Sequence, residues 1–197
     1  DVRAEVVDRL NAGQAHFEEP DLDTLVKAAV NSRQLMAATK PAAAHAYIVA
    51  VPTPFNNEQD GRKTPDLSYV EAATRSLASV VVPGCLVILE STSPVGTTEL
   101  MRDWLMDERR KQGLSAEPED FLFAHCPERI LPGQMMKELV SNDRICGGLT
   151  PKASEVARTL YSCFCSAQIF VTDARTAEMS KLTENSYRDV NIAFANE

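Results

Sequence analysis

Residues 83–99 read PGCLVILESTSPVGTTE, and this stretch decides the fold class. Pro83-Gly84 predicts a turn, the apolar run CLVILE predicts a strand, and Gly96-Thr97-Thr98-Glu99 resembles a helix start with an acidic residue in its first turn. A strand that leads into a helix in this way is part of a βα unit. The stretch therefore predicts a parallel sheet whose strands are joined by helices.

Short apolar runs alternate with amphipathic stretches along the rest of the chain as well. We predict strands over residues 45–51, 85–90, 121–125, 144–147 and 168–171. We predict helices over residues 4–10, 22–30, 69–80, 97–111 and 153–163. The polar stretch 56–64 is the best candidate for a flexible loop, and 112–120 is a second candidate. This order predicts an α/β protein with a Rossmann-like, doubly wound parallel sheet.

Polar residues follow three of the predicted strands. The run HAYIVAV leads into Pro52-Thr53-Pro54, CLVILE into Ser91-Thr92-Ser93, and FLFAH into Cys126-Pro127-Glu128-Arg129. Ligands of doubly wound sheets bind outside the carboxyl ends of the strands, and the prolines fix φ so that each exit holds its side chains in place. Each exit alone is also compatible with ordinary turn chemistry, but the three together favour a binding site.

A second set of polar residues lies on a predicted helix. In residues 176–197, TAEMSKLTENSYRDVNIAFANE, the spacing of Lys181, Asn185 and Arg188 places them on one helix face. An ammonium, a carboxamide and a guanidinium together suit an anionic ligand that is rich in oxygen. The helical pattern continues to Glu197 without a Gly or Pro stop signal, so we expect the sequence to be a piece of a longer protein.

Length, composition and charge limit the classes of protein to which this chain can belong. A chain of 197 residues that is 44% hydrophobic and 24% charged can bury a core as one globular domain, with the beginning of a second. Its net charge of −8 argues against non-specific binding to nucleic acid or to an anionic membrane surface. No apolar run approaches the ~20 residues that span a bilayer, and residues 1–10 lack the features of a signal peptide. We therefore expect a cytoplasmic protein without membrane insertion.

The cysteines give no sign of a metal site. They are Cys85, Cys126, Cys146, Cys163 and Cys165. Their number is odd, none of their spacings suits zinc, and the last two are too close together for an ordinary pair of ligands. We interpret all five as reduced thiols and predict no bound metal.

Five motifs, in order along the chain, carry a family resemblance. They are IVAVPTPF (48–55), VILESTSPVGTTE (87–99), AHCPERILPG (124–133), NDRICGG (142–148) and residues 176–197. From end to end the chain resembles the UDP-glucose/GDP-mannose dehydrogenase family, and most closely its UDP-N-acetyl-D-mannosamine dehydrogenase branch. The resemblance implies an NAD-dependent enzyme that oxidises the C6 alcohol of a nucleotide sugar twice, through an aldehyde to a carboxylate, for cell-surface polysaccharide synthesis.

The resemblance also implies parts that these residues lack. Members of the family open with a strand, a GxGxxG-type turn and a helix, and no such turn occurs here. Asp1 matches the acidic residue that binds the adenosine ribose of NAD, which implies that the first βαβ unit is truncated. The nucleophilic cysteine of the family lies beyond residue 197, whereas Cys126 matches a variable position and is interpreted as a buried thiol.

Two domains are implied by the same resemblance. Residues 1–172 would form the truncated NAD-binding domain. Residues 173–197 would begin a central helical domain, through which the full-length protein is expected to form a homodimer.

The matched motifs imply roles on the last helix and after the third strand exit. Lys181 is implied to stabilise a developing oxyanion or to handle a proton, and Asn185 to bind the same oxygen or an ordered water. Both are also implied to bind substrate, together with Arg129, Ile130 and Arg188. The guanidinium groups suit diphosphate or carboxylate oxygens, and Ile130 offers backbone contacts to the sugar nucleotide. A solvated lysine and a salt-bridged Arg129 are the alternatives.

Further matches lie at the strand exits. Glu128 and Thr92 match catalytic positions that orient or activate the hydrolytic water and lie near the nicotinamide. Thr53 and Thr98 match NAD-contacting positions, with Thr98 near a helix N-terminus, although turn and capping residues without a ligand are the alternative interpretation. One position departs from the glucose-oxidising members, which carry a second glutamate where this chain has Pro132. This difference favours the N-acetylmannosamine branch.

Two hypotheses for the function follow. The first is an NAD-dependent 6-dehydrogenase that converts UDP-N-acetyl-D-mannosamine to UDP-N-acetyl-D-mannosaminuronate, with UDP-glucose or GDP-mannose as alternative substrates. The second is that the 197 residues alone are an inactive nucleotide-sugar-binding fragment with an exposed sheet edge. Production of NADH separates the two hypotheses.

Overall fold

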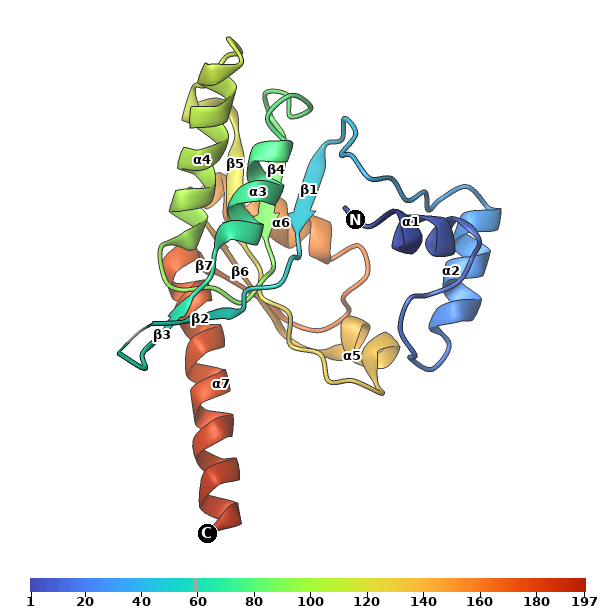
Figure 1. Ribbon diagram of the computed structural model, residues 1–197, viewed down its shortest axis with the longest axis vertical. Helices are drawn as coiled ribbons and strands as arrows, with labels where there is room; N and C mark the ends of the chain where they lie inside the picture. Colours follow the sequence, from blue (N-terminus) through green and yellow to red (C-terminus); the bar gives the residue numbers. More distant parts are fainter. Residues whose placement is uncertain (59) are drawn as a thin grey trace. The chain divides into compact units, whose positions relative to one another are not determined.

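The computed structural model describes residues 1–58 and 60–197 (Figure 1). The chain divides into two compact units. The sheet unit contains residues 43–128, 143–163 and 168–197, and the helical unit contains residues 1–42, 129–142 and 164–167.

A five-stranded sheet forms the centre of the sheet unit, in the order β1-β4-β5-β6-β7. Its strands are β1 (Ala46–Val49), β4 (Leu86–Leu89), β5 (Leu122–His125), β6 (Arg144–Gly148) and β7 (Ile169–Asp173). Each corresponds to one predicted strand. β1, β4 and β5 are parallel to one another, so their carboxyl ends lie at one edge, as the sequence predicted.

The sheet is not parallel throughout. β6 runs antiparallel to β5, with Ala124 opposite Gly148 and His125 opposite Gly147, and β7 runs parallel to β6. The predicted parallel sheet is therefore mostly parallel, with its last two strands reversed. The reversal brings Arg144, the first residue of β6, to the edge at which β4 and β5 end.

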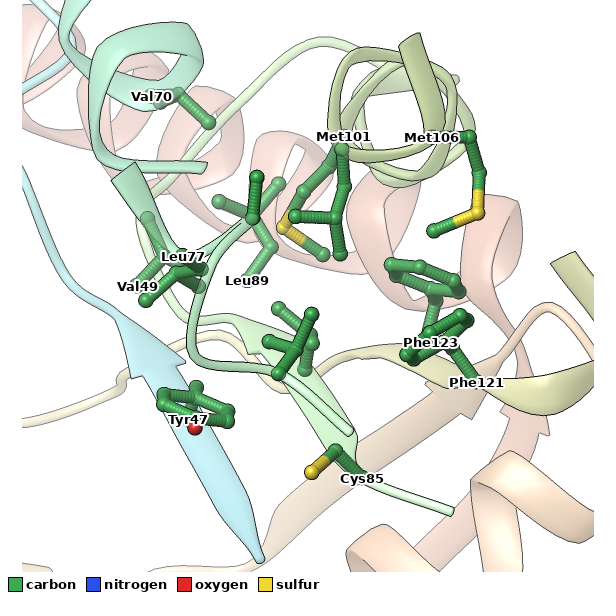
Figure 2. Packing of buried hydrophobic residues seen from close by; sticks show 14 of the residues in the cluster. Tyr47, Val49, Val70, Leu77, Cys85, Leu89, Met101, Met106, Phe121 and Phe123 are labelled. Atoms are coloured by element: carbon green, nitrogen blue, oxygen red, sulfur yellow. The ribbon is translucent and has the colours of Figure 1, made fainter. Parts of the chain in front are cut away.

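Helices cover both faces of the sheet. On one face, α3 (Ser68–Ser76) and α4 (Thr97–Lys111) pack over β1, β4 and β5. Figure 2 shows this core, in which Leu89, Met101 and Phe123 are buried. On the other face, α6 (Pro151–Tyr161) packs Ala157 and Tyr161 against the sheet. Because β4 is buried on both faces, its sequence LVIL shows no alternation of polar and apolar residues.

Local sequence signals begin the helices that follow the sheet strands. Gly96, at φ 97°, precedes α4 in the left-handed region that favours glycine. Thr150 caps α6 by accepting a hydrogen bond from Ala153 N at 3.1 Å. Asp173 caps α7 (Ala174–Asn196) by accepting from Thr176 N at 2.9 Å. Each helix therefore starts where its capping residue places it.

The helix α7 is the longest one that the structure describes, and it extends away from the sheet (Figure 1). Only its first turns are buried, at Ala174, Ala177 and Glu178. Residues 186–197 are all exposed. Among residues 1–58 and 60–197, neither α7 nor any other helix is both long enough and apolar enough to cross a membrane.

Two glycines allow helices to approach β6 closely. A Cβ atom on Gly147 would overlap the carbonyl oxygen of Asp173 and lie 2.7 Å from the Ala177 Cβ. A Cβ atom on Gly148 would lie 2.5 Å from Ser154 N, at the start of α6. The glycines of the NDRICGG motif are therefore explained by packing, because any side chain would push α6 and α7 off the sheet.

The helical unit contains α1 (Ala4–Asn11), α2 (Leu22–Asn31) and α5 (Met135–Ser141). Polar side chains hold its turns. Asn11 exchanges two hydrogen bonds with the backbone of Ala37, at 3.0 and 2.9 Å. The Glu19 carboxylate accepts from Gly133 N at 2.9 Å and from Met135 N at 2.7 Å, at the start of α5.

Every predicted helix and strand is present, and α4 has the predicted bounds while the others have shifted ends. Two features of the connections differ from the prediction. The stretch 56–64, predicted as a flexible loop, begins and ends in an antiparallel ribbon of β2 (Phe55–Asn57) and β3 (Lys63–Pro65). Within that stretch, Gln59 lies outside the described residues. The helix α5 was not predicted. Both misses are short elements without a fully buried residue, so no periodic apolar pattern marks them.

The tight contact at Gly147 yields a stability prediction. Gly147→Ala should lower the free energy of unfolding by more than about 3 kcal/mol, because the new Cβ meets backbone that cannot move away cheaply. Gly84→Ala is the matched control, since Gly84 has φ 89° and open space around it, and should cost about 1–2 kcal/mol. Urea unfolding measures both. Equal costs at the two positions would contradict the packing explanation.

Candidate functional site

Side-chain hydrogen bonds join the exits of β1 and β4 into one rim. Ser91 Oγ accepts from Val51 N at 2.8 Å and donates to Val51 O at 2.7 Å. Thr53 Oγ1 donates to the Thr92 carbonyl oxygen at 2.7 Å. Two of the three predicted strand exits are thus tied together. Because the Thr53 proton is used within the protein, Thr53 offers a ligand only an acceptor.

The exit of β4 also presents hydroxyls that the fold does not consume. Thr92 is half-buried and Ser93 is buried. Within residues 1–58 and 60–197, the Ser93 hydroxyl has no hydrogen-bond partner. A buried hydroxyl without a partner costs free energy. An unused donor at this edge fits a ligand that is rich in hydroxyl or phosphate oxygens.

The third exit, after β5, places Glu128 at the end of the sheet unit, where it is half-buried behind the buried Pro127. His125, the last residue of β5, is buried. Burial lowers the pKa of His125 to about 4, against the opposing effect of the Leu89 backbone. His125 is therefore a neutral imidazole at pH 7, and sequence analysis did not single it out.

Glu178 joins the start of α7 to the start of α4. Its carboxylate is 1% exposed and accepts hydrogen bonds from Gly96 N at 2.6 Å, from Thr98 N at 2.8 Å and from Thr98 Oγ1 at 2.6 Å. A helix N-terminus binds an anion through its unpaired N–H groups and its dipole. Here that anion is supplied by the protein itself.

This arrangement bears on Thr98, which was predicted to contact NAD. Its side chain is fully buried, and both its N–H and its hydroxyl donate to Glu178. The structure thus uses both donors of Thr98 within the protein, in the first turn of α4 after its N-cap residue Gly96. A contact between Thr98 and a cofactor stays a prediction.

The predicted stripe on α7 forms as expected from its spacing. Arg188 Nη2 donates to Asn185 Oδ1 at 3.1 Å, which confirms that the two side chains share a face. Lys181 lies one turn before Asn185, and both are half-buried while Arg188 is exposed. In the part of the chain that the structure describes, Lys181 forms no hydrogen bond or ion pair. Its ammonium is therefore available to a ligand.

A surface hollow of about 760 Å³ lies on a different face of α7. It is lined by Val95, Arg175, Thr176, Met179, Ser180, Thr183, Glu184 and Tyr187. None of the predicted site residues lines it. On α7, the residues that line the hollow are centred roughly half a turn around the helix axis from the Lys181 stripe. The hollow and the stripe are therefore separate surfaces of one helix.

A buried polar cluster lies beneath the strand exits, on the α6 side of the sheet. Tyr161 OH donates to Glu90 Oε1 at 3.0 Å, and the Arg144 guanidinium lies over the Tyr161 ring, 5.0 Å from its centroid. Burial raises the pKa of Glu90, against the Tyr161 hydrogen bond and the Arg144 charge. Cys126 and Cys146, both fully buried, complete the cluster.

Three further predicted residues belong to the helical unit. Asp1 is exposed, and its Oδ1 accepts from Arg3 N at 2.9 Å. Arg129 is exposed, and its carbonyl oxygen accepts from Asn142 Nδ2 at 2.9 Å. Ile130 is half-buried. Among the described residues, no cluster of three or more metal-ligating side chains occurs.

Comparison with known proteins identifies the family. Residues 1–165 match the model of the UDP-glucose/GDP-mannose dehydrogenase family, NAD binding domain. The chain belongs to the UDP-glucose/GDP-mannose dehydrogenase family. Its cofactor is accordingly that of this domain, NAD. The sequence motifs thus pointed to the right family.

Individual relatives agree with this assignment. The chain is 55% identical over 203 residues to an NDP-N-acetyl-D-galactosaminuronic acid dehydrogenase of Ralstonia nicotianae and 53% identical over 200 residues to a UDP-N-acetyl-D-mannosamine dehydrogenase of Yersinia pestis. These alignments cover 100% of the chain but 46% and 47% of the relatives. The chain therefore spans about half the length of the curated relatives it matches.

A solved structure also resembles the fold. The UDP-D-ManNAc dehydrogenase from Pyrococcus horikoshii superposes with a TM-score of 0.91 at 43% identity. The match covers 100% of this chain and 46% of that one. The mostly parallel sheet with helices on both faces is thus the fold of this dehydrogenase family.

The depressed pKa of His125 predicts a pH dependence. An unfolded chain binds a proton near pH 6.5, whereas the folded protein excludes it down to about pH 4. The free energy of unfolding therefore has its full value above pH 6.5 and falls as the pH falls towards 4. From this group we expect a loss of about 2 kcal/mol between pH 7 and pH 5.

Urea unfolding at several pH values checks this expectation. His125→Gln cannot titrate, so the variant should lose about 2 kcal/mol less than the parent protein over the same interval. Parallel stability curves for the two proteins would show that His125 does not carry the effect.

Proposed function

We propose that the protein containing this chain is an NAD-dependent 6-dehydrogenase of a nucleotide sugar. It would convert UDP-N-acetyl-D-mannosamine to UDP-N-acetyl-D-mannosaminuronate for cell-surface polysaccharide synthesis. The observation that carries the proposal is the Lys181–Asn185–Arg188 stripe, which begins three residues after the Glu178 anchor in a chain with the NAD-binding domain of this family.

The residues of the chain support distinct parts of the reaction. The ammonium of Lys181 can stabilise negative charge on the C6 oxygen as its proton leaves, and Asn185 can donate to the same oxygen or to a water. Arg188 suits the diphosphate. Glu128, half-buried behind a proline, can orient the water that completes the oxidation to the carboxylate.

The remaining predicted residues would hold substrate and cofactor. When bound, NAD supplies the hydride acceptor for both oxidations. Thr92 and Thr53 offer hydroxyl oxygens at the rim, and Asp1 offers a carboxylate to a ribose. Arg129 and Ile130 would contact the sugar nucleotide. Thr98 has the least support as a cofactor contact, because Glu178 occupies both of its donors.

The domain boundary, the assembly and the location belong to the same proposal. Residues 1–172 would be the NAD-binding domain and residues 173–197 the start of a central helical domain. The exposed apolar side chains of Tyr187 (72%) and Phe194 (83%) support a homodimer through α7, which light scattering of the full-length protein would test. Five cysteines outside disulfides support a reducing compartment, the cytoplasm.

The substrate is tested by measuring NADH production by the full-length protein. UDP-N-acetyl-D-mannosamine is expected to react with the highest kcat/KM and to yield two NADH per sugar. UDP-glucose, GDP-mannose and UDP-N-acetyl-D-galactosamine complete the panel, the last because of the Ralstonia relative. The 197 residues alone should give no NADH, since they contain no GxGxxG turn. NADH formation with none of these sugars would refute the proposal.

Lys181 provides the sharpest test of the site. Lys181→Ala in the full-length protein should lower kcat at least about a thousandfold, because the oxyanion loses its cation. Lys152→Ala is the matched control, since Lys152 is an exposed lysine on α6, and should keep the parent rate. Steady-state NADH formation measures both, with melting curves to confirm folding. Retained turnover in Lys181→Ala would remove this residue from the mechanism.

A further inference from the structure

Two buried cysteines face each other at the end of β5. Cys126 and Cys146 are both 0% exposed. Their sulfur atoms are 3.5 Å apart, and the Cys146 thiol donates to the Cys126 sulfur. The two residues are 20 positions apart in sequence, so only the reversal of β6 brings them together.

The strand register makes this pair suitable for a disulfide. The antiparallel pairs Ala124–Gly148 and His125–Gly147, continued by one step, place Cys126 directly opposite Cys146. Leu149 N donates to Phe123 O across the two strands, whereas Cys126 N donates away from β6 to Leu89 O. Residues 126 and 146 therefore form a pair without backbone hydrogen bonds between them.

Pairs of this kind have the right backbone spacing. Opposed residues without mutual backbone hydrogen bonds have Cα atoms about 4.5 Å apart, within the roughly 4.4–6.8 Å that disulfides span. A rotation about the Cα–Cβ bonds can then bring the sulfurs to bonding distance without moving the strands. We propose that Cys126 and Cys146 form a redox modification site that a hydroperoxide, such as hydrogen peroxide, converts to a disulfide.

The surroundings of the pair favour reaction at Cys126. The hydrogen bond from the Cys146 thiol and the charge of Arg144 lower the pKa of the Cys126 thiol, against the effect of burial. Arg144 is held in place over the Tyr161 ring. A thiolate is the reactive form towards peroxides, so Cys126 is the attacking sulfur and Cys146 the resolving one.

The chemistry balances with peroxide as the oxidant. The Cys126 thiolate attacks one peroxide oxygen, the O–O bond breaks, and a sulfenic acid forms while the other oxygen leaves as water after taking a proton. The Cys146 sulfur then attacks the Cys126 sulfur, the S–O bond breaks, and the hydroxide leaves as water with the Cys146 proton. Two thiols lose two electrons in total, and one peroxide becomes two waters.

The link would restrain a segment that carries part of the proposed site. It closes a loop over residues 127–145, which contains Glu128, Arg129 and Ile130. A disulfide limits the conformations of the unfolded chain, so the oxidised protein should melt at a higher temperature than the reduced one. Formation of the link does not rest on the proposed function, and its test needs no enzymatic activity.

Peptide mapping after peroxide treatment of the native protein tests the site. Cleavage after Lys and Arg places Cys126 in residues 112–129, Cys146 in residues 145–152, Cys85 in residues 76–102, and both Cys163 and Cys165 in residues 159–175. Every pairing between different peptides thus gives a different mass. We expect the 112–129/145–152 link to exceed any other link within this chain at least about tenfold, and to disappear with dithiothreitol.

Three variants serve as controls. Cys146→Ser keeps a hydrogen-bond donor beside Cys126 but cannot form the link, so it should leave a sulfenic acid on Cys126 that dimedone traps. Cys126→Ala should give neither the sulfenic acid nor the link. Cys163→Ser removes the exposed cysteine and should leave the link unchanged. Melting curves confirm that each variant is folded.

Several results would overturn the proposal. One is a Cys126 that remains a thiol, or goes on to a sulfinic acid without the link, while the exposed Cys163 is oxidised. Another is a set of links in the native protein that matches the set formed in urea, where the five cysteines pair without the constraint of the fold.

Discussion

The position of α7 depends on the buried carboxylate of Glu178. It accepts three hydrogen bonds from Gly96 and Thr98 at the start of α4, where the helix dipole favours an anion. The neighbouring Arg175–Glu99 ion pair, at 2.8 Å, joins the same elements but is exposed and adds little in water. The Lys181 stripe begins one turn after Glu178, so this anchor sets where the stripe lies relative to the strand exits.

The polar side chains near the strand exits and on α7 fall into two groups, those that hydrogen-bond to the protein backbone and those without a partner in the described part of the chain. At the rim, the hydroxyls of Ser91 and Thr53 donate to backbone carbonyl oxygens and make the strand exits rigid. Ser93 and Lys181, by contrast, keep polar atoms that no described residue engages. Rigid donors beside unused ones are what a site needs to orient a ligand without reorganising. The helix α7 carries two separate surfaces, the Lys181 stripe on one face and the hollow on another.

Much of the fold and part of the site could be predicted from sequence. The strands β1, β4 and β5 are short apolar runs ending in proline-containing turns, and such runs define both the elements and the shared edge. The reversal of β6 leaves no such signal, because the sequence RICGG is compatible with parallel and with antiparallel pairing. In the sequence, Glu178 looks like an ordinary surface glutamate three residues before a lysine. Its burial depends on Gly96, 82 positions away, which local patterns do not register. The Cys126–Cys146 contact was missed for the same reason.

Hydrogen exchange at individual backbone amides tests the role of Glu178 most directly. In the parent protein, the amides of Gly96 and Thr98 should exchange slowly, since both donate to a buried carboxylate. In Glu178→Gln, one of the two acceptor oxygens is replaced by an NH2 group, which is itself a donor and cannot accept from Gly96 N or Thr98 N. Both amides, and those of residues 174–185 on α7, should then exchange at least about tenfold faster, whereas Glu155→Gln on α6 should change neither group. Fast exchange at Gly96 and Thr98 in the parent, or unchanged protection in Glu178→Gln, would contradict the account.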